Sequence, residues 1–432
     1  MSGTQMAETI DCRLFVIGAG MSGMAAAVFA SRRGLQTVLA GGTGESIFAS
    51  GLIDLMGVHP PAQGNTWDDP WAAIAAATRD DPRHPYARLN AGDIRQALDE
   101  MFAFLETAGL PYRRRADRNV DVLTAVGTLK RTYGVPLTMW AGVEAREKRA
   151  PGLIVDIRGL KGFSARQIAA TVGHRWPGLA AARVSFPDTE NRGEVYGEHL
   201  ARSLALTDIR EALAERIRPL VGQVSVVGLP ALLGVARSHE ITSDLAERIG
   251  LPVFEIPTIP PSVPGVRLKE TFEQSLPPKG VRLLLNRRVL SVKMRAGGGF
   301  EAAVGRENVE SIVRADAVIL ATGRYLGGGL RADRSRIRET LFDLPVFQPE
   351  DRNRWHRPNF LDPRGHPVNR AGLETDRSFR PTRPDGTPAA PGLFAVGTLL
   401  AHQDWMRMKC GAGLAVASAY GAVKALAGDP PD

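Results

Sequence analysis

The stretch Leu14-Phe15-Val16-Ile17-Gly18-Ala19-Gly20-Met21-Ser22-Gly23 decides the fold, because an apolar run leads directly into glycines with the G-x-G-x-x-G spacing. Residues 14–17 predict a buried strand, residues 21–33 a helix, and residues 36–39 a second strand. In such a βαβ unit the glycines permit a tight turn, and the helix amino terminus faces a phosphate. The glycines expected to bind the cofactor are Gly18, Gly20 and Gly23.

Two later stretches return to the same kind of site. Residues 316–323 form an apolar strand that ends in Ala-Thr-Gly, as is common in flavoproteins with two dinucleotide folds. Residues 392–397 predict a last core strand, and residues 414–426 a helix of small residues whose amino terminus can face a flavin carbonyl or phosphate. The further cofactor contacts predicted here are Thr322, Gly323, Gly397, Gly411 and Gly413.

The loop over residues 41–51 offers backbone amides and small hydroxyls that can lie against a flat ring. Its predicted cofactor contacts are Ser46, Ser50 and Gly51. The loop holds no histidine, so a covalent histidyl flavin is not predicted. The second strand ends in Ala40-Gly41, where an adenosine-binding unit usually has an acidic residue for the ribose. The nearest carboxylate is Glu45, so a mononucleotide flavin stays open beside a dinucleotide.

Composition excludes several classes of protein. With 44% hydrophobic and 23% charged residues, the chain has an ordinary globular balance. The net charge of +8 comes mostly from scattered arginines, which favours a small anionic substrate, a phosphate cofactor or an acidic partner over nucleic acid. Two cysteines exclude a disulfide framework and a four-cysteine metal or iron–sulfur site, so no metal site is predicted. No secretion signal and no transmembrane segment is expected, which points to the cytoplasm.

The predicted fold class is α/β, a discontinuous Rossmann-like FAD/NAD(P)-binding domain of three-layer ββα architecture with an inserted α/β cap domain. Prolines at five positions within residues 251–265 make regular structure improbable in that crossing segment. The expected division is 1–60, 266–330 and 381–432 for the flavin-binding domain, 61–265 for the cap, which meets substrate or partner, and 331–380 for a connection.

The chain resembles the B subunits of anaerobic glycerol-3-phosphate dehydrogenase. Beside the first glycine turn, the resemblance is carried by Ser50-Gly51-Leu52-Ile53-Asp54-Leu55, Gly127-Thr128-Leu129-Lys130, Pro260-Pro261-Ser262-Val263-Pro264-Gly265-Val266-Arg267-Leu268 and Cys410-Gly411-Ala412-Gly413. It implies oxidation of sn-glycerol 3-phosphate to dihydroxyacetone phosphate, with electrons passed to membrane quinone through an iron–sulfur C subunit and with a catalytic A subunit as partner. It also implies FMN on this chain, with FAD the alternative, and a peripheral place on the inner membrane face through a partner.

Oxidation of a secondary alcohol beside a flavin needs a base for the hydroxyl proton and cations for a phosphate. His402, which follows the last core strand, is the predicted base. Arg324 is a further cation that can serve a phosphate or the flavin, whereas Cys410 is expected to be a packing residue. The residues predicted to bind the substrate phosphate are Lys130, Arg131, Arg267, Arg407 and Lys409.

Two alternatives stay open on the sequence. In the first, the flavin never meets substrate and only carries electrons between the A subunit and the iron–sulfur subunit. The second is a nicotinamide-dependent Rossmann dehydrogenase, against which the missing acidic residue at Ala40-Gly41 counts. Oxidation of substrate and electron transfer alone require the same flavin site, so motifs do not separate them.

Overall fold

The computed structural model describes residues 7–42 and 44–428. The chain divides into two compact units, and each unit is built from separate stretches of sequence. The first unit consists of Met1–Glu45, Asp54–Phe104 and Phe272–Asp432. The second unit consists of Ser46–Ile53 and Leu105–Thr271.

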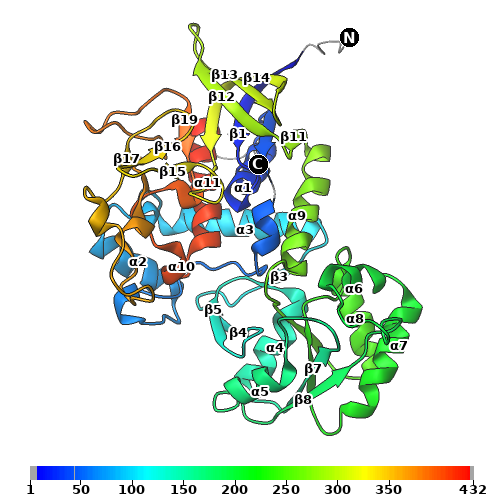
Figure 1. The fold of residues 1–432 in the computed structure, drawn as a ribbon. Helices are drawn as coiled ribbons and strands as arrows, with labels where there is room; N and C mark the ends of the chain where they lie inside the picture. The colour runs from blue at the N-terminus through cyan, green and yellow to red at the C-terminus, as the bar shows by residue number, and fades with distance from the viewer. Residues whose placement is uncertain (1–6, 43, 429–432) are drawn as a thin grey trace. The chain divides into compact units, whose positions relative to one another are not determined.

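A seven-stranded sheet forms the centre of the first unit, in the order β11-β2-β1-β14-β13-β12, with β19 paired to β14 (Figure 1). The strands β11, β2, β1, β14 and β19 run parallel, whereas β12, β13 and β14 form an antiparallel meander. The strands of this sheet are β1 (Glu8–Ile17), β2 (Thr37–Gly41), β11 (Val281–Leu285), β12 (Arg288–Met294), β13 (Phe300–Gly305), β14 (Val309–Leu320) and β19 (Leu393–Ala395).

The long strand β14 connects the parallel and antiparallel parts of this sheet. Its first part pairs with β13, where Ala315 lies opposite Phe300, and its last residues pair with β19, where Val318 lies opposite Leu393. The strand β12 contacts β2, although three strands separate the two in the sheet order. The meander therefore folds back over the parallel strands as a second β layer. This confirms the predicted Rossmann-like α/β fold.

Helix α1 (Met21–Arg32) packs on β1, β2 and β14 and against α11 (Gly411–Ala427), which together make the helical layer. Every residue of α1 from 22 to 30 is buried, as its alanine-rich sequence allows. Tyr420 of α11 meets Phe29 of α1 edge to face, with ring centroids 5.3 Å apart. Within the described residues, no helix combines the length and the apolar composition needed to cross a membrane.

The stretch Asp54–Phe104, which includes α2 and most of α3, also belongs to the first unit. Lys424 of α11 pairs with Asp93 of α3 at 3.1 Å, and the Tyr86 hydroxyl donates to the Leu55 carbonyl at 2.8 Å. The compact unit thus reaches to Phe104, whereas the sequence placed the start of the inserted segment at residue 61. Which unit binds the cofactor and which serves as a cap stays a prediction.

The remaining helices and strands of the first unit are α2 (Pro70–Asp80), α3 (Ala91–Thr107, which enters the second unit), β15 (Leu330–Ala332), β16 (Ile337–Glu339), β17 (Val346–Phe347), β18 (Gly372–Leu373) and α10 (Trp405–Met408).

The second unit is an α/β domain around a four-stranded parallel sheet of order β10-β9-β7-β8. Alternate residues of β7 face two different cores: Leu153, Val155 and Ile157 pack with α7 and α8, and Ile154 packs with α5. The chain order changes direction between β7 and β9, so the sheet is doubly wound. The elements of this unit are β3 (Tyr112–Arg113), β4 (Val120–Leu123), β5 (Leu129–Thr132), β6 (Val135–Pro136), α4 (Leu137–Glu147), β7 (Gly152–Ile157), α5 (Ala165–Val172), β8 (Leu179–Val184), α6 (Gly197–Ser203), α7 (Thr207–Ile217), β9 (Val226–Pro230), α8 (Ser238–Ile249), β10 (Val253–Ile256) and α9 (Val263–Ser275, which continues into the first unit).

The expectation that residues 251–265 lack regular structure is wrong. Strand β10 occupies the four residues between Pro252 and Pro257, and α9 begins at Val263. As the edge strand of its sheet, β10 needs backbone donors on one side only. Pro264 stands in the first turn of α9, where a backbone N–H has no partner within the helix.

A buried ion pair joins the end of β10 to α9. Arg267 donates to Glu255 through two nitrogens, at 2.5 and 2.7 Å, and its Nε donates to the Gly234 carbonyl at 2.7 Å. Glu255 also accepts the Leu233 N–H at 2.7 Å, and both charged side chains are almost fully buried. Burial raises the pKa of Glu255, but the Arg267 charge and the hydrogen bonds outweigh it and leave that pKa below its usual value.

We expect Glu255→Gln to lower the free energy of unfolding by about 3–5 kcal/mol, because it leaves the Arg267 charge buried and uncompensated. Urea unfolding followed by circular dichroism measures this change. Glu194→Gln, which breaks the exposed pair with Lys161, is the control and should change little. Equal urea midpoints for the two variants would show that the buried pair does not hold the second unit together.

Candidate functional site

The glycine-rich turn lies where the first strand, the first helix and the end of β14 meet. Gly18 has a φ of +114°, and a Cβ on it would lie 2.2 Å from the Ala321 carbonyl oxygen. A Cβ on Gly23 would lie 1.8 Å from the Gly18 carbonyl oxygen. Only glycine fits at either position, since the backbones of the turn, of α1 and of β14 approach one another directly.

The amino terminus of α1 is suited to a phosphate. Gly20 occupies its N-cap with no side-chain cap, and the first turn of the helix contains no acidic residue. No heavy atom of the described residues outside its immediate neighbours lies within 4 Å of the position that a Cβ on Gly20 would take. The first-turn N–H groups lack helical partners, and the helix dipole favours an anion there. The residues around Gly20 therefore fit a cofactor phosphate.

Thr322 and Gly323 lie just beyond the end of β14, after Ala321. The backbone of the preceding residue, Ala321, donates to the Ile17 carbonyl at 2.8 Å, which places this segment beside the end of β1. The Thr322 hydroxyl oxygen is buried and has no hydrogen-bond partner among the described residues. A buried hydroxyl without a partner is costly, so a ligand atom is a natural partner for Thr322.

The last strand and the last helix bring three more predicted glycines to the same unit. Gly397 lies beside Ser22 of α1, and its N–H donates to the Ser418 hydroxyl at 2.9 Å. The Gly413 N–H donates to the Asp54 carbonyl at 2.8 Å. Gly411 is the first residue of α11, whose first turn contains no acidic residue and has no side-chain cap. The α11 amino terminus thus has the same electrostatic character as that of α1.

Arg324, which the sequence offered as a phosphate or flavin cation, braces the backbone. Its guanidinium donates to the carbonyls of Thr398 at 2.6 Å, Leu400 at 3.0 Å and Gln403 at 3.1 Å, and also to that of Asn369. Burial lowers the pKa of Arg324 to about 10, so the side chain stays charged at neutral pH. The sequence gives no sign of this backbone role, because the partners of Arg324 are carbonyls from distant segments.

His402 is almost fully buried in the first unit and has a positive φ of +64°. Its Nε2 lies 2.6 Å from Glu374 Oε1, and its ring packs against Phe347 at 4.1 Å. Because Nε2 donates to the carboxylate, Nδ1 keeps the lone pair, and Nδ1 is buried without a partner among the described residues. Burial lowers the pKa of His402 below its usual value, and Glu374 partly offsets that effect.

Arg407 and Lys409 lie close to His402 in the sequence. Arg407 donates to the Asp404 carboxylate at 3.3 Å, within the short helix α10. Lys409 ends that helix in a left-handed conformation, with φ +52°. Cys410 is fully buried, and this burial raises the pKa of its thiol. A neutral buried thiol agrees with the packing role expected for this cysteine.

The loop with Ser46, Ser50 and Gly51 belongs to the second unit. Ser262 lies in the segment after β10, and its hydroxyl donates to the Ala49 carbonyl at 2.5 Å. The Tyr112 hydroxyl donates to the Gly51 carbonyl at 2.6 Å. Leu52 packs in a core cluster with Ala231, the residue after β9. The loop therefore lies over the carboxyl ends of the parallel strands, where doubly wound sheets usually bind their ligands.

The predicted phosphate ligands of the second unit have partners inside the protein. Arg131 donates to the Asp121 carboxylate at 2.7 and 3.2 Å, and Arg146 approaches the same carboxylate at 2.9 Å. Lys130 Nζ lies 3.5 Å from the Ser50 hydroxyl. Arg267 is held by Glu255 and the Gly234 carbonyl. The assignment of Lys130, Arg131 and Arg267 to a substrate phosphate stays a prediction.

The predicted residues thus fall into two sets, one in each unit. The first unit contains Gly18, Gly20, Gly23, Thr322, Gly323, Gly397, Gly411, Gly413, His402, Arg407 and Lys409. The second unit contains Ser46, Ser50, Gly51, Lys130, Arg131 and Arg267. Across residues 7–42 and 44–428, no group of three or more His, Cys, Asp or Glu side chains is arranged to hold a metal ion.

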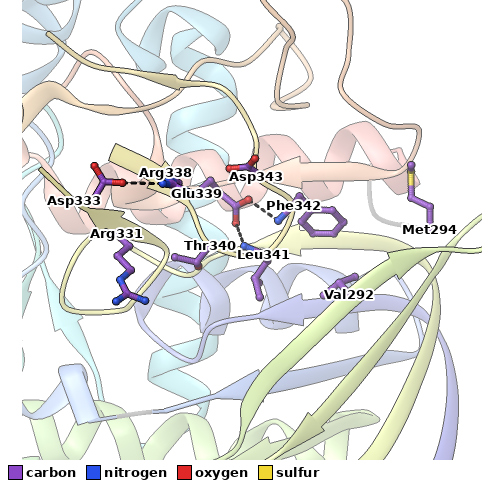
Figure 2. Close-up of a pocket in the computed structure, with 10 residues that line it drawn as sticks. All are labelled: Val292, Met294, Arg331, Asp333, Arg338, Glu339, Thr340, Leu341, Phe342 and Asp343. Carbon is purple, nitrogen blue, oxygen red and sulfur yellow. Dashed lines mark hydrogen bonds and ion pairs between the residues drawn. The ribbon is translucent and has the colours of Figure 1, made fainter. Parts of the chain in front are cut away.

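A cavity of about 860 Å³ in the first unit is lined by none of the predicted site residues (Figure 2). Glu339 lies in its wall, where it accepts the N–H groups of Leu341 at 2.9 Å and Phe342 at 2.7 Å. Arg338 pairs with Asp333 at 2.9 Å. Asp333, Arg338 and Glu339 in this lining bond the local backbone or one another, and Arg331 lines the cavity beside them.

Comparison with known proteins gives the family. The family model described as an FAD binding domain matches residues 13–414. The B subunit of the anaerobic glycerol-3-phosphate dehydrogenase of Vibrio cholerae serotype O1 is 30% identical over 95% of both chains. A probable B subunit of the same enzyme from Halobacterium salinarum is 29% identical over 97% of this chain and 98% of that one. Among solved structures, the 3-ketosteroid Δ1-dehydrogenase of Sterolibacterium denitrificans matches 96% of this chain and 99% of that chain, at 13% identity and a TM-score of 0.43.

The family match and the geometry around Gly20 agree on the cofactor. The uncapped α1 amino terminus fits a phosphate, and the buried Thr322 hydroxyl lacks a partner among the described residues. The cofactor is a flavin. The chain is a flavin-dependent oxidoreductase that belongs to the FAD-binding family and, within it, to the family of B subunits of anaerobic glycerol-3-phosphate dehydrogenase.

Proposed function

We propose that this chain is the flavin-binding B subunit of an enzyme that oxidises sn-glycerol 3-phosphate to dihydroxyacetone phosphate. Electrons then pass to membrane quinone through an iron–sulfur C subunit, and a catalytic A subunit completes the complex. The observation that carries the proposal is the similarity to named B subunits along nearly the whole of both chains. Under this proposal the protein is cytoplasmic and reaches the inner membrane face through a partner subunit.

The flavin would be held mainly by backbone groups of the first unit. The N–H groups at the start of α1 would bind its phosphate, with Thr322 as a hydroxyl contact. When bound, the flavin supplies an acceptor for a hydride from the alcohol carbon. The second strand ends in Ala40-Gly41 and not in an acidic residue that would hold an adenosine ribose, which favours FMN over FAD.

Heat release of the chromophore from the purified protein, followed by chromatography, identifies the flavin. We expect FMN, because no acidic side chain stands at the end of β2 to hold an adenosine ribose. Release of FAD would contradict the FMN assignment and leave the family intact. A colourless protein that is fully folded by circular dichroism would contradict the proposal itself.

A carboxylate at the start of α1 should separate flavin binding from folding. We expect Met21→Glu to weaken flavin affinity about tenfold or more, because the new charge repels the phosphate at the helix amino terminus. The same charge is favourable to the free helix, so the apoprotein should unfold at an unchanged or higher temperature. Flavin titration by fluorescence and thermal unfolding measure the two effects. Met21→Gln is the neutral control, and equal affinities for the two variants would place the phosphate elsewhere.

We assign to His402 the role of the base that accepts the hydroxyl proton, with Nδ1 as the accepting atom. Glu374 would act as a positioning residue, because it fixes the proton on Nε2 and leaves Nδ1 basic. The low pKa of His402 keeps the ring neutral at physiological pH, which a base requires. Arg407 and Lys409 remain the proposed phosphate cations on the same segment.

The assembled complex should lose about 10²- to 10⁴-fold in kcat with His402→Asn, measured by dye reduction with glycerol 3-phosphate. The wild-type rate should rise with pH through the His402 pKa, since only the neutral ring accepts a proton. Glu374→Gln removes an interaction that raises this pKa, so the midpoint of the rise should move to lower pH. Flavin content of each variant controls for folding. A His402→Asn complex with the wild-type rate and pH profile would remove His402 from the chemistry.

A second function, electron transfer without substrate contact, is favoured by one set of observations. Arg131 and Arg267 already have carboxylate partners, and His402 Nδ1 is buried. Rapid mixing of the isolated chain with glycerol 3-phosphate separates the two functions. Bleaching of its flavin without any partner supports the substrate site, and bleaching that requires the A subunit supports electron transfer. The FAD-binding family match speaks against the nicotinamide-dependent alternative.

A further inference from the structure

A short turn in the first unit exposes two large apolar side chains side by side. Phe360 is 83% exposed and Leu361 is 78% exposed. Burial of such side chains normally stabilises a folded protein, so a neighbouring exposed pair calls for an explanation. The glycine-rich site does not use this turn, since none of the predicted cofactor or substrate residues belongs to it.

Hydrogen bonds fix the turn in this conformation. The Leu361 N–H donates to the Asn359 side-chain oxygen at 3.0 Å, and the Asp362 N–H donates to the Asn359 carbonyl at 3.1 Å. His366 accepts the Arg357 N–H on Nδ1 at 3.0 Å and lies 3.0 Å from the Phe360 carbonyl through Nε2. The two apolar side chains are therefore presented by an ordered backbone, which lowers the entropy cost of binding through them.

A cationic cavity of about 630 Å³ adjoins the turn. Its charged lining is Arg331, Arg334, Arg352, His356 and Asp333. Within the described part of the chain, Arg331 and Arg334 make no side-chain hydrogen bond or ion pair. Asp333 does not neutralise these two, because one of its oxygens accepts three local groups and the other pairs with Arg338, the interaction drawn in Figure 2.

The cavity and the apolar turn are continuous on the surface. The ring of His356, which lines the cavity, lies 5.3 Å from the ring of His366. The ring of His366 in turn lies 6.4 Å from that of Phe360. The anionic Asp362 within the turn is paired with Arg364 at 2.7 Å, so it adds no net negative charge. The exposed side chains of Phe360 and Leu361 thus lie next to a cavity whose Arg331 and Arg334 have no anionic partner in the described chain.

We propose that this face docks onto an anionic phospholipid surface. A lipid phosphate would bind in the cavity to Arg331 and Arg334, and Phe360 and Leu361 would enter the boundary of the acyl chains. A phospholipid combines an anionic phosphate in its headgroup with apolar acyl chains, and this face combines arginines that have no partner among the described residues with exposed apolar side chains. A protruding apolar turn suits a fluid surface, which needs no preformed socket. The proposal concerns direct contact by this chain and does not depend on the proposed function.

The test is sedimentation of the full, flavin-loaded chain with two kinds of vesicle. One consists of phosphatidylcholine alone, and in the other about a third of the lipid is anionic phosphatidylglycerol. We expect binding to the anionic vesicles only, weakened by salt. Phe360→Ser with Leu361→Ser should reduce the partition coefficient about tenfold, and Arg331→Ser with Arg334→Ser should do the same. Matched controls are Leu206→Ser with Leu220→Ser, two exposed leucines of the second unit, and Arg166→Ser with Arg192→Ser.

Each outcome supports or overturns the proposal. Equal binding to both vesicle types, or none, overturns it. Loss of binding in the arginine variant alone, with competition by millimolar inorganic phosphate, would show an anion site without membrane docking and also overturns it. If the Phe360 and Leu361 variant binds vesicles like its control but loses a partner subunit on co-purification, the face belongs to a protein. Unchanged flavin content and circular dichroism in every variant ensure that folding is not the cause.

Discussion

The fold depends on a direct backbone contact, in which Gly18 and Gly23 bring α1 against the carboxyl end of β14. The atoms nearest to the missing Cβ positions are carbonyl oxygens, of Ala321 and of Gly18 itself. Because a carbonyl oxygen cannot move aside as a flexible side chain can, the contact fixes strand, helix and turn together. The open space beside Gly20 and the buried Thr322 hydroxyl both lie next to this contact.

The arginine-rich composition has a largely internal explanation. Arg324 ties together carbonyls from two segments of the first unit, and Arg267 holds Glu255 and the loop at Gly234 in the second. Arg33 similarly donates to the carbonyl of Phe29 in its own helix. The planar guanidinium has five donors and can satisfy several backbone carbonyls at once, which lysine cannot do. A net charge of +8 therefore needs no nucleic acid to account for it.

Sequence reasoning predicted the first βαβ unit closely, because its apolar periods and glycines are local signals: α1 ends at Arg32, one residue before the prediction. The prediction of irregular structure for residues 251–265 was wrong, because β10 is an edge strand and an edge strand tolerates flanking prolines. The position of a strand in its sheet cannot be read from local sequence. At the site, glycines were predictable from spacing alone. The partners of Arg267, Arg324 and His402 were not, since Glu255, Glu374 and the backbone carbonyls reach them only through tertiary folding.

The interrupted chain path of the first unit also bears on synthesis at the ribosome. Helix α1 is buried along residues 22–30, but its partner α11 begins only at Gly411. At roughly 5–20 residues per second, on the order of 20–80 seconds separate the emergence of the two. During that interval the apolar flank of α1 has no α11 to cover it. The second unit, whose sheet lies within residues 152–256, is therefore fully synthesised before α11 is available to cover α1.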